Sequence, residues 1–130
     1  GFFMGLESTV ASWQDSSGGK VHADEFKAAV EYLRMAGAQS ITAYVLLGHP
    51  DLESQDVEHS IRFAHQCGTR VLLSEFSPIP GTIDGEKSNP WADLDEPLSH
   101  NKTAFALRRL GAESINRLKT LTHTLNESLL

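Results

Sequence analysis

Blocks of apolar and amphipathic sequence alternate along the first two thirds of the chain and predict three strands and two long helices. Two nearly continuous apolar runs, 41–47 and 71–76, lack alternation and are typical of strands buried on both faces of a parallel sheet. A shorter apolar run predicts a strand near residues 2–6. Apolar residues at helical spacing predict helices over 22–36 and 54–67. The order is therefore strand, helix, strand, helix, strand.

Short links between these elements predict parallel strands with right-handed crossovers, so both helices should cover the same face of the sheet. Three parallel strands make a poor free-standing sheet, and a complete (β/α) barrel needs roughly 200 residues or more. The expected fold class is therefore α/β, a fragment of a (β/α) barrel with about three parallel strands, plus C-terminal helices. We also expect self-association through the exposed sheet.

The remaining segments have other patterns. Residues 9–20 are polar and predict a loop. Residues 83–97 are acidic and predict a connection without secondary structure, whereas 98–130 is helical in pattern, with Gly111 separating two apolar sets. The predicted organisation is thus a barrel portion over 1–82, an acidic connector and a C-terminal helical segment.

Charge and composition argue against some classes of binding partner and against some cellular settings. The 130 residues include 11 Lys and Arg against 17 Asp and Glu, a formal net charge of −6, which argues against nucleic acid or an anionic membrane as partner. No apolar run approaches the ~20 residues of a membrane span, and the N-terminus lacks the basic flank of a signal peptide. A cytoplasmic, reducing setting is the expectation. The single Cys67 excludes an internal disulfide or a self-contained iron–sulfur site and predicts a buried structural thiol.

Histidine spacing gives no metal motif. The chain has six histidines, none paired at i,i+4, and we predict no metal ligands in it. His49 alone lies where a strand should end, and a functional and a structural role are equally compatible with that position. The glycine and serine motifs of phosphate-binding loops and of nucleophilic hydrolases are absent.

Glycine and proline gather at the three predicted strand ends, in GLES at 5–8, GHPD at 48–51 and SPIPGT at 77–82. The carboxyl ends of parallel strands meet at one edge, where such folds place their active sites. Glycines there allow the backbone to approach a flat ligand, and the carbonyls of a proline-rich run can accept from an adenine edge. The alternative interpretation is ordinary turn chemistry.

In this order the segments GLES, YVLLGHPD, FSPIPGT and DLDEPLSHNKT resemble the C-terminal half of a radical S-adenosylmethionine (radical SAM) enzyme, from residue 1 to about residue 105. The resemblance implies a partial (β/α) barrel whose fourth, fifth and sixth strands end here. It implies a [4Fe–4S] cluster, held by a CxxxCxxC loop, and S-adenosylmethionine, which is cleaved to a 5′-deoxyadenosyl radical. This chain has no CxxxCxxC, so the cluster ligands are expected in another part of a parent protein. The 130 residues alone are not expected to cleave S-adenosylmethionine.

The resemblance also implies cofactor-binding residues at the first two strand ends. Glu7 and Ser8 stand where relatives place a polar side chain that bonds the ribose or the methionine moiety. Residues 44–51 look like the family's GxIxGxxE motif. In it Leu46 stands for the Ile that packs on adenine and Gly48 matches, whereas Tyr44 replaces the first Gly and Asp51 replaces Glu.

At the third strand end, Pro78, Ile79 and Pro80 match the segment that contacts adenine through its backbone. Near the barrel mouth His100, Asn101 and Lys102 are candidate substrate contacts, although a solvated connector and a helix start explain them as well. The substrate itself is not readable from the sequence.

Two other functions remain open. The chain could be the half-barrel of another (β/α) enzyme with phosphate bound at its glycine loops. It could also be a non-catalytic α/β interaction module with the C-terminal helices as docking surface. A CxxxCxxC motif encoded upstream of residue 1 would favour the radical SAM interpretation.

Overall fold

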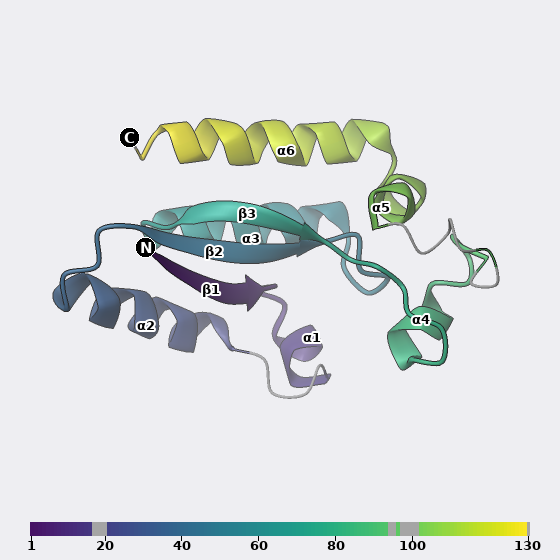
Figure 1. The fold of residues 1–130 in the computed structure, drawn as a ribbon, viewed down its shortest axis with the longest axis horizontal. Helices are drawn as coiled ribbons and strands as arrows, with labels where there is room; N and C mark the ends of the chain where they lie inside the picture. The colour runs from purple at the N-terminus through teal and green to yellow at the C-terminus, as the bar shows by residue number, and fades with distance from the viewer. Residues whose placement is uncertain (17–20, 94–95, 97–101, 130) are drawn as a thin grey trace.

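Three parallel strands form the centre of the molecule (Figure 1). The computed structural model describes residues 1–16, 21–93, 96 and 102–129. The strands are β1 (Phe2–Glu7), β2 (Ile41–Leu47) and β3 (Arg70–Glu75), in the order β1-β2-β3 with both pairings parallel. The predicted α/β class, with parallel strands and helical crossovers, is confirmed.

Within the described residues, six helices accompany the sheet. They are α1 (Ala11–Ser16), α2 (Ala23–Met35), α3 (Ser54–Gln66), α4 (Ile83–Lys87), α5 (Lys102–Leu110) and α6 (Ala112–Glu127). None of these helices, in the part of the chain that the structure describes, is long and apolar enough to cross a bilayer.

Two sequence predictions about the connections are wrong. The segment expected to be only loop contains α1, and the connector expected to lack secondary structure contains α4. Both helices are too short to show an apolar periodicity, and tertiary contacts hold them. The break at Gly111 is confirmed, because this glycine has a φ of +85° between α5 and α6.

Local signals explain where the long helices begin and end. At the start of α3, the Glu53 carbonyl accepts from Asp56 N at 3.0 Å, and the Asp56 carboxylate accepts from Glu53 N at 2.9 Å. This reciprocal pair satisfies two backbone N–H groups that a helix leaves open. Helices α2 and α3 end at Gly37 and Gly68, whose φ angles of +98° and +85° suit glycine.

The main core lies between the sheet and one layer of helices. On β2 the inward side chains are Ile41, Ala43, Val45 and Leu47, each at most 1% exposed. Helices α2, α3 and α6 contribute to the same core, the last through Leu118, so both crossover helices cover one face as predicted.

The opposite face of the sheet is only partly covered. Phe3 is 64% exposed and stacks on Tyr44 with ring centroids 5.9 Å apart, while Leu72 is 46% exposed. Tyr44 and Leu46 are half-buried. The prediction that β2 and β3 are buried on both faces therefore holds for one face only, because no helix of the described chain packs across the other.

The outer edge of β3 is closed by α6. The Asn126 side-chain amide accepts from Val71 N at 2.8 Å and donates to Val71 O at 2.9 Å. It thus takes the hydrogen bonds that a further strand would make there.

All three strands point to the same end of the molecule, where α1, α4 and α5 gather, whereas both chain termini lie at the other end (Figure 1). The carboxyl ends of the strands are therefore the place to look for a site.

Candidate functional site

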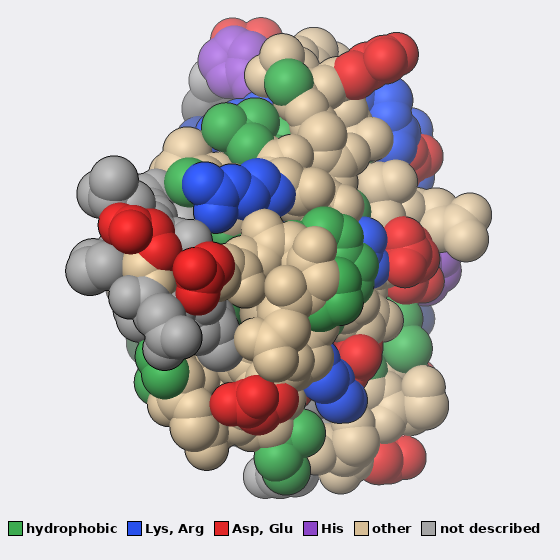
Figure 2. Space-filling view, turned by 90° about the vertical axis from the view of Figure 1, so that its right-hand side faces the viewer, with side chains coloured by type: hydrophobic (Ala, Val, Ile, Leu, Met, Phe, Trp, Pro, Cys, Tyr) green, Lys and Arg blue, Asp and Glu red, His purple; other side chains and the backbone are tan. Residues whose placement is uncertain are grey.

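A cavity of about 700 Å³ opens at the carboxyl ends of the strands. Its lining comes from the strand ends, from α1, from the loop after β2 and from the segment that forms α4: Glu7, Trp13, Ser16, Leu46, His49, Asp51, Phe76, Thr82, Ile83, Asp84 and Lys87. Figure 2 views the molecule from this end and shows hydrophobic side chains in the middle, with acidic and basic ones around them.

Glu7 reaches the cavity through an irregular strand end. The pairing of β1 with β2 shifts register between Gly5 and Glu7, and Glu7 has a φ of +63°, which is unusual for a residue with a side chain. A Cβ on Gly5 would lie 3.2 Å from Glu7 Oε1, so the Glu7 carboxylate lies back over Gly5. Strained backbone of this kind is typical of binding sites.

His49 is the most buried polar residue of the lining, at 1% exposure. Its Nδ1 accepts from Asp51 N at 3.0 Å. Trp13 and Phe76 meet the imidazole edge-on, with ring centroids 5.5 and 4.8 Å away. The loop after β2 and two aromatic rings thus fix the orientation of the ring.

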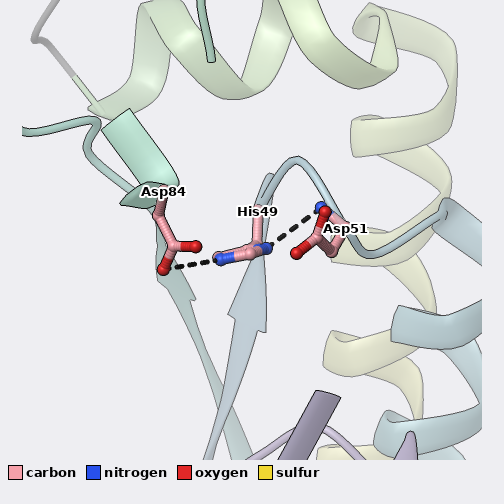
Figure 3. Close-up of side chains that lie close together, drawn as sticks. All are labelled: His49, Asp51 and Asp84. Atoms are coloured by element: carbon pink, nitrogen blue, oxygen red, sulfur yellow. Dashed lines mark hydrogen bonds and ion pairs between the residues drawn. The ribbon is translucent and has the colours of Figure 1, made fainter. Parts of the chain in front are cut away.

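The other ring nitrogen faces α4. His49 Nε2 lies 3.1 Å from Asp84 Oδ2, although without the alignment of a good hydrogen bond (Figure 3). Because Nδ1 accepts from a backbone N–H, it carries no proton, so the ring is neutral and Nε2 holds the hydrogen.

His49, Asp51 and Asp84 could be considered a metal site, since one ligand atom from each lies within 4.8 Å of the others. A metal-bound histidine needs a bare nitrogen toward the ion, and its other N–H usually donates to an oxygen. His49 has the reverse arrangement. The geometry therefore favours a hydrogen-bond donor over a metal ligand at Nε2.

A second charged contact joins the same loop to α4. Lys87 Nζ donates to Asp51 Oδ2 at 2.8 Å. The hydrogen bond to Asp51 raises the pKa of Lys87, so its ammonium stays charged. Asp51 is thereby engaged by a cation from within the chain.

Helix α4 is held against the loop after β3. The Thr82 hydroxyl accepts from Gly85 N at 2.9 Å and donates to Ile79 O at 2.7 Å. A Cβ on Gly85 would lie 1.9 Å from Ile79 O, so only glycine fits there. This packing brings Asp84 and Lys87 to the cavity.

The same packing takes the proline segment away from the cavity. Pro78 is buried, Ile79 and Pro80 are exposed, and none of the three belongs to the lining. The Ile79 carbonyl is already used by Thr82. The backbone contact with adenine that the resemblance implies for this segment therefore stays a prediction, made without α4.

The other predicted residues fall into two groups. Glu7 and Leu46 line the cavity, as expected for residues at strand ends. Ser8 is 1% exposed and its hydroxyl accepts from Val10 N at 3.1 Å. Tyr44 lies further down the open face against Phe3, and a Cβ on Gly48 would meet Ala106 of α5 at 3.2 Å.

Sequence reasoning missed several of the described lining residues, among them Trp13, Phe76, Asp84 and Lys87. Two signals were available in the sequence. One is a tryptophan within a polar segment. The other is a Thr followed by acidic residues and a Lys, a pattern that is typical of a short helix. Of the residues expected near the barrel mouth, His100 and Asn101 lie outside the described residues, and Lys102 begins α5.

Cys67 lies far from this site in the topology. It caps the C-terminal end of α3, just before β3 begins, and burial raises the pKa of its half-buried thiol. One protonated thiol at the opposite end of the strands does not fit a [4Fe–4S] cluster.

Comparisons with known proteins show the fold. No protein-family model matches the chain, and no curated protein sequence is similar to it. Among solved structures, coproporphyrinogen III oxidase (HemN) from Escherichia coli, described as a radical SAM enzyme, superposes with a TM-score of 0.58 over 91% of this chain. The identity is 15% and the match covers 26% of that enzyme, so the chain spans about a quarter of its length. The chain is thus similar in fold to part of a radical SAM enzyme.

Proposed function

We propose that this chain supplies part of the S-adenosylmethionine pocket of a radical SAM enzyme. The observation that carries the proposal is the cavity at the carboxyl ends of three parallel strands, in a fold similar to part of HemN. Ligands of (β/α) folds bind at that end. The [4Fe–4S] cluster that such an enzyme needs does not fit the residues of this chain, so the cluster ligands belong elsewhere in a parent protein. The reducing, cytoplasmic setting expected from the lone cysteine is part of this proposal.

The charges of the lining suit a cationic ligand. Among the described lining residues, Glu7, Asp51 and Asp84 carry carboxylates and Lys87 carries an ammonium. S-adenosylmethionine carries a sulfonium and an ammonium group, and carboxylates attract both. Trp13 and Phe76 supply aromatic surface for a flat base.

A phosphate-binding half-barrel is the weaker candidate. The carboxylates of Glu7, Asp51 and Asp84 would repel a phosphate, and none of the described lining residues is an arginine. The N-terminus of α4 lies at the cavity, but the Thr82 hydroxyl already accepts from Gly85 N there, and Asp84 and Glu86 in the first turn add negative charge that disfavours a phosphate.

The test is a calorimetric titration of the chain with S-adenosylmethionine and, separately, with inorganic phosphate. We expect binding of the first only. Glu7→Gln should weaken that binding about ten- to hundredfold, because a charge-assisted hydrogen bond contributes roughly 1.5–3 kcal/mol. Glu31→Gln, an exposed change on α2, is the matched control and should have no effect. Phosphate binding without S-adenosylmethionine binding would overturn the proposal.

A further inference from the structure

We propose that His49 is a positioning residue that holds the Asp84 carboxylate at the cavity, and that Asp84 binds the cationic part of the ligand. This inference rests on the proposed function and adds a residue pair that the resemblance does not assign. Asp84 belongs to α4, a helix that the sequence pattern did not predict.

The first step is that His49 cannot turn away from Asp84. Its side chain is 2% exposed, its Nδ1 is held by the backbone of Asp51, and Trp13 and Phe76 flank the ring. The fixed tautomer leaves an N–H at Nε2, and this buried group has no aligned acceptor in the described structure. A buried donor without an acceptor is costly, so the nearby carboxylate is drawn toward it.

The second step is that the Asp84 carboxylate lies between His49 and the cavity. One of its oxygens lies 3.1 Å from His49 Nε2, while the side chain as a whole is 45% exposed and lines the cavity. The remaining acceptor positions of the carboxylate are therefore open to a ligand.

The third step concerns charge. A neutral imidazole N–H that lies 3.1 Å from Asp84 Oδ2 does not cancel the negative charge of the carboxylate. Lys87 is paired directly with Asp51 at 2.8 Å and acts on Asp84 only through a weaker charge interaction. Asp84 is thus a better partner than Asp51 for a sulfonium or an ammonium group, and His49 fixes the position of the Asp84 carboxylate.

Three adenosyl compounds separate the ligand groups: S-adenosylmethionine has a sulfonium and an ammonium, S-adenosylhomocysteine only the ammonium, and 5′-deoxyadenosine neither. We expect Asp84→Asn to weaken the first about tenfold and to leave 5′-deoxyadenosine within about twofold. The response of S-adenosylhomocysteine then assigns the contact to the ammonium or to the sulfonium. Glu86→Gln removes an exposed carboxylate from the same helix and should change none of the affinities.

A double-mutant cycle tests the positioning role. His49→Leu should weaken S-adenosylmethionine binding several-fold alone and have no further effect in the Asp84→Asn background. His49→Gln should restore most of the affinity, because a glutamine amide can accept from Asp51 N and donate to Asp84. If His49 had a purely structural role, its substitution would lower the melting temperature but would not show this coupling with Asp84 in ligand affinity. Thermal melts of the variants measure the loss of stability separately.

Nitrogen NMR of the imidazole tests the tautomer without any ligand, and a proton on Nδ1 would overturn the inference. Tight binding of Mn²⁺ or Zn²⁺ that both His49→Leu and Asp84→Asn abolish would overturn it in favour of a metal centre. Unchanged affinity of Asp84→Asn for S-adenosylmethionine would overturn the inference while leaving the proposed function in place. Failure of the wild-type chain to bind any adenosyl compound would overturn both.

Discussion

The two faces of the sheet carry similar apolar side chains and meet different surroundings. On the helix-covered face Val45 and Leu47 are fully buried, whereas on the open face Phe3 and Leu72 are 64% and 46% exposed. Free energy of folding comes from area removed from water, so the same residue types stabilise the chain on one face and much less on the other. We propose that the open face meets another surface, because apolar side chains exposed together are typical of contact surfaces.

The largest expected loss of stability comes from a substitution on the helix-covered face. Leu47→Ala removes a fully buried side chain from the core and should lower the free energy of unfolding by about 2–5 kcal/mol. Leu72→Ala makes the same chemical change on the open face and should cost less than about 1 kcal/mol. Urea denaturation of the two variants measures the difference between the faces, and equal losses would show that the open face is covered in solution.

The next prediction concerns the edge where the covered face ends. Asn126→Ala removes both hydrogen bonds to the backbone of Val71 and should lower the free energy of unfolding by about 1–2 kcal/mol. Hydrogen exchange of the Val71 amide should become faster in this variant. A protected Val71 amide would mean that α6 closes the edge without the Asn126 side chain.

A change on the open face should alter association more than stability. We expect the chain to self-associate through Phe3, Tyr44 and Leu72, and Leu72→Lys should shift it toward the monomer in sedimentation velocity. Tyr32→Lys is the control, since Tyr32 is 73% exposed on α2, away from this face. Wild-type chain that stays monomeric at high micromolar concentration would contradict the prediction.

The smallest expected effect lies on the outside of the helix layer. Arg117 of α6 and Arg62 lower the pKa of Glu58 on α3 below its ordinary value of 4.5. A carboxylate whose pKa is lower in the folded than in the unfolded state stabilises the fold above the unfolded-state pKa. This contribution is lost as the pH falls through the folded-state pKa. Glu58→Gln should therefore cost less than about 1 kcal/mol at pH 7, and the cost should shrink progressively as the pH is lowered below 4.5, as read from paired thermal melts.

The sequence predicts the strands and long helices well because their signals are local. Continuous apolar runs mark β2 and β3, and Gly37, Gly68 and Gly111 mark helix ends through a positive φ. Burial on only one face of β2 could not be predicted, since it depends on what else packs there.

The site divides in the same way. Glu7 and Leu46 reach the cavity because strand ends of a parallel sheet meet at one edge, which the order of elements already implies. Asp84 and Lys87 reach it only because Gly85 packs on the Ile79 carbonyl and turns a connector into α4. The pattern from Thr82 to Lys87 is typical of a short helix, but it does not specify the contact of Gly85 with Ile79 that brings this helix to the cavity.

The close approach of Gly48 to Ala106 limits how this protein can evolve. A Cβ on Gly48 would lie 3.2 Å from the Ala106 Cβ and 3.3 Å from its Cα, and Gly48 also has a φ of +94°. Neither position can gain volume unless α5 moves away from the end of β2. Since His49 follows Gly48 directly, a larger residue at position 106 would also displace a residue of the cavity lining. Homologous chains should therefore keep small residues at positions 48 and 106 together.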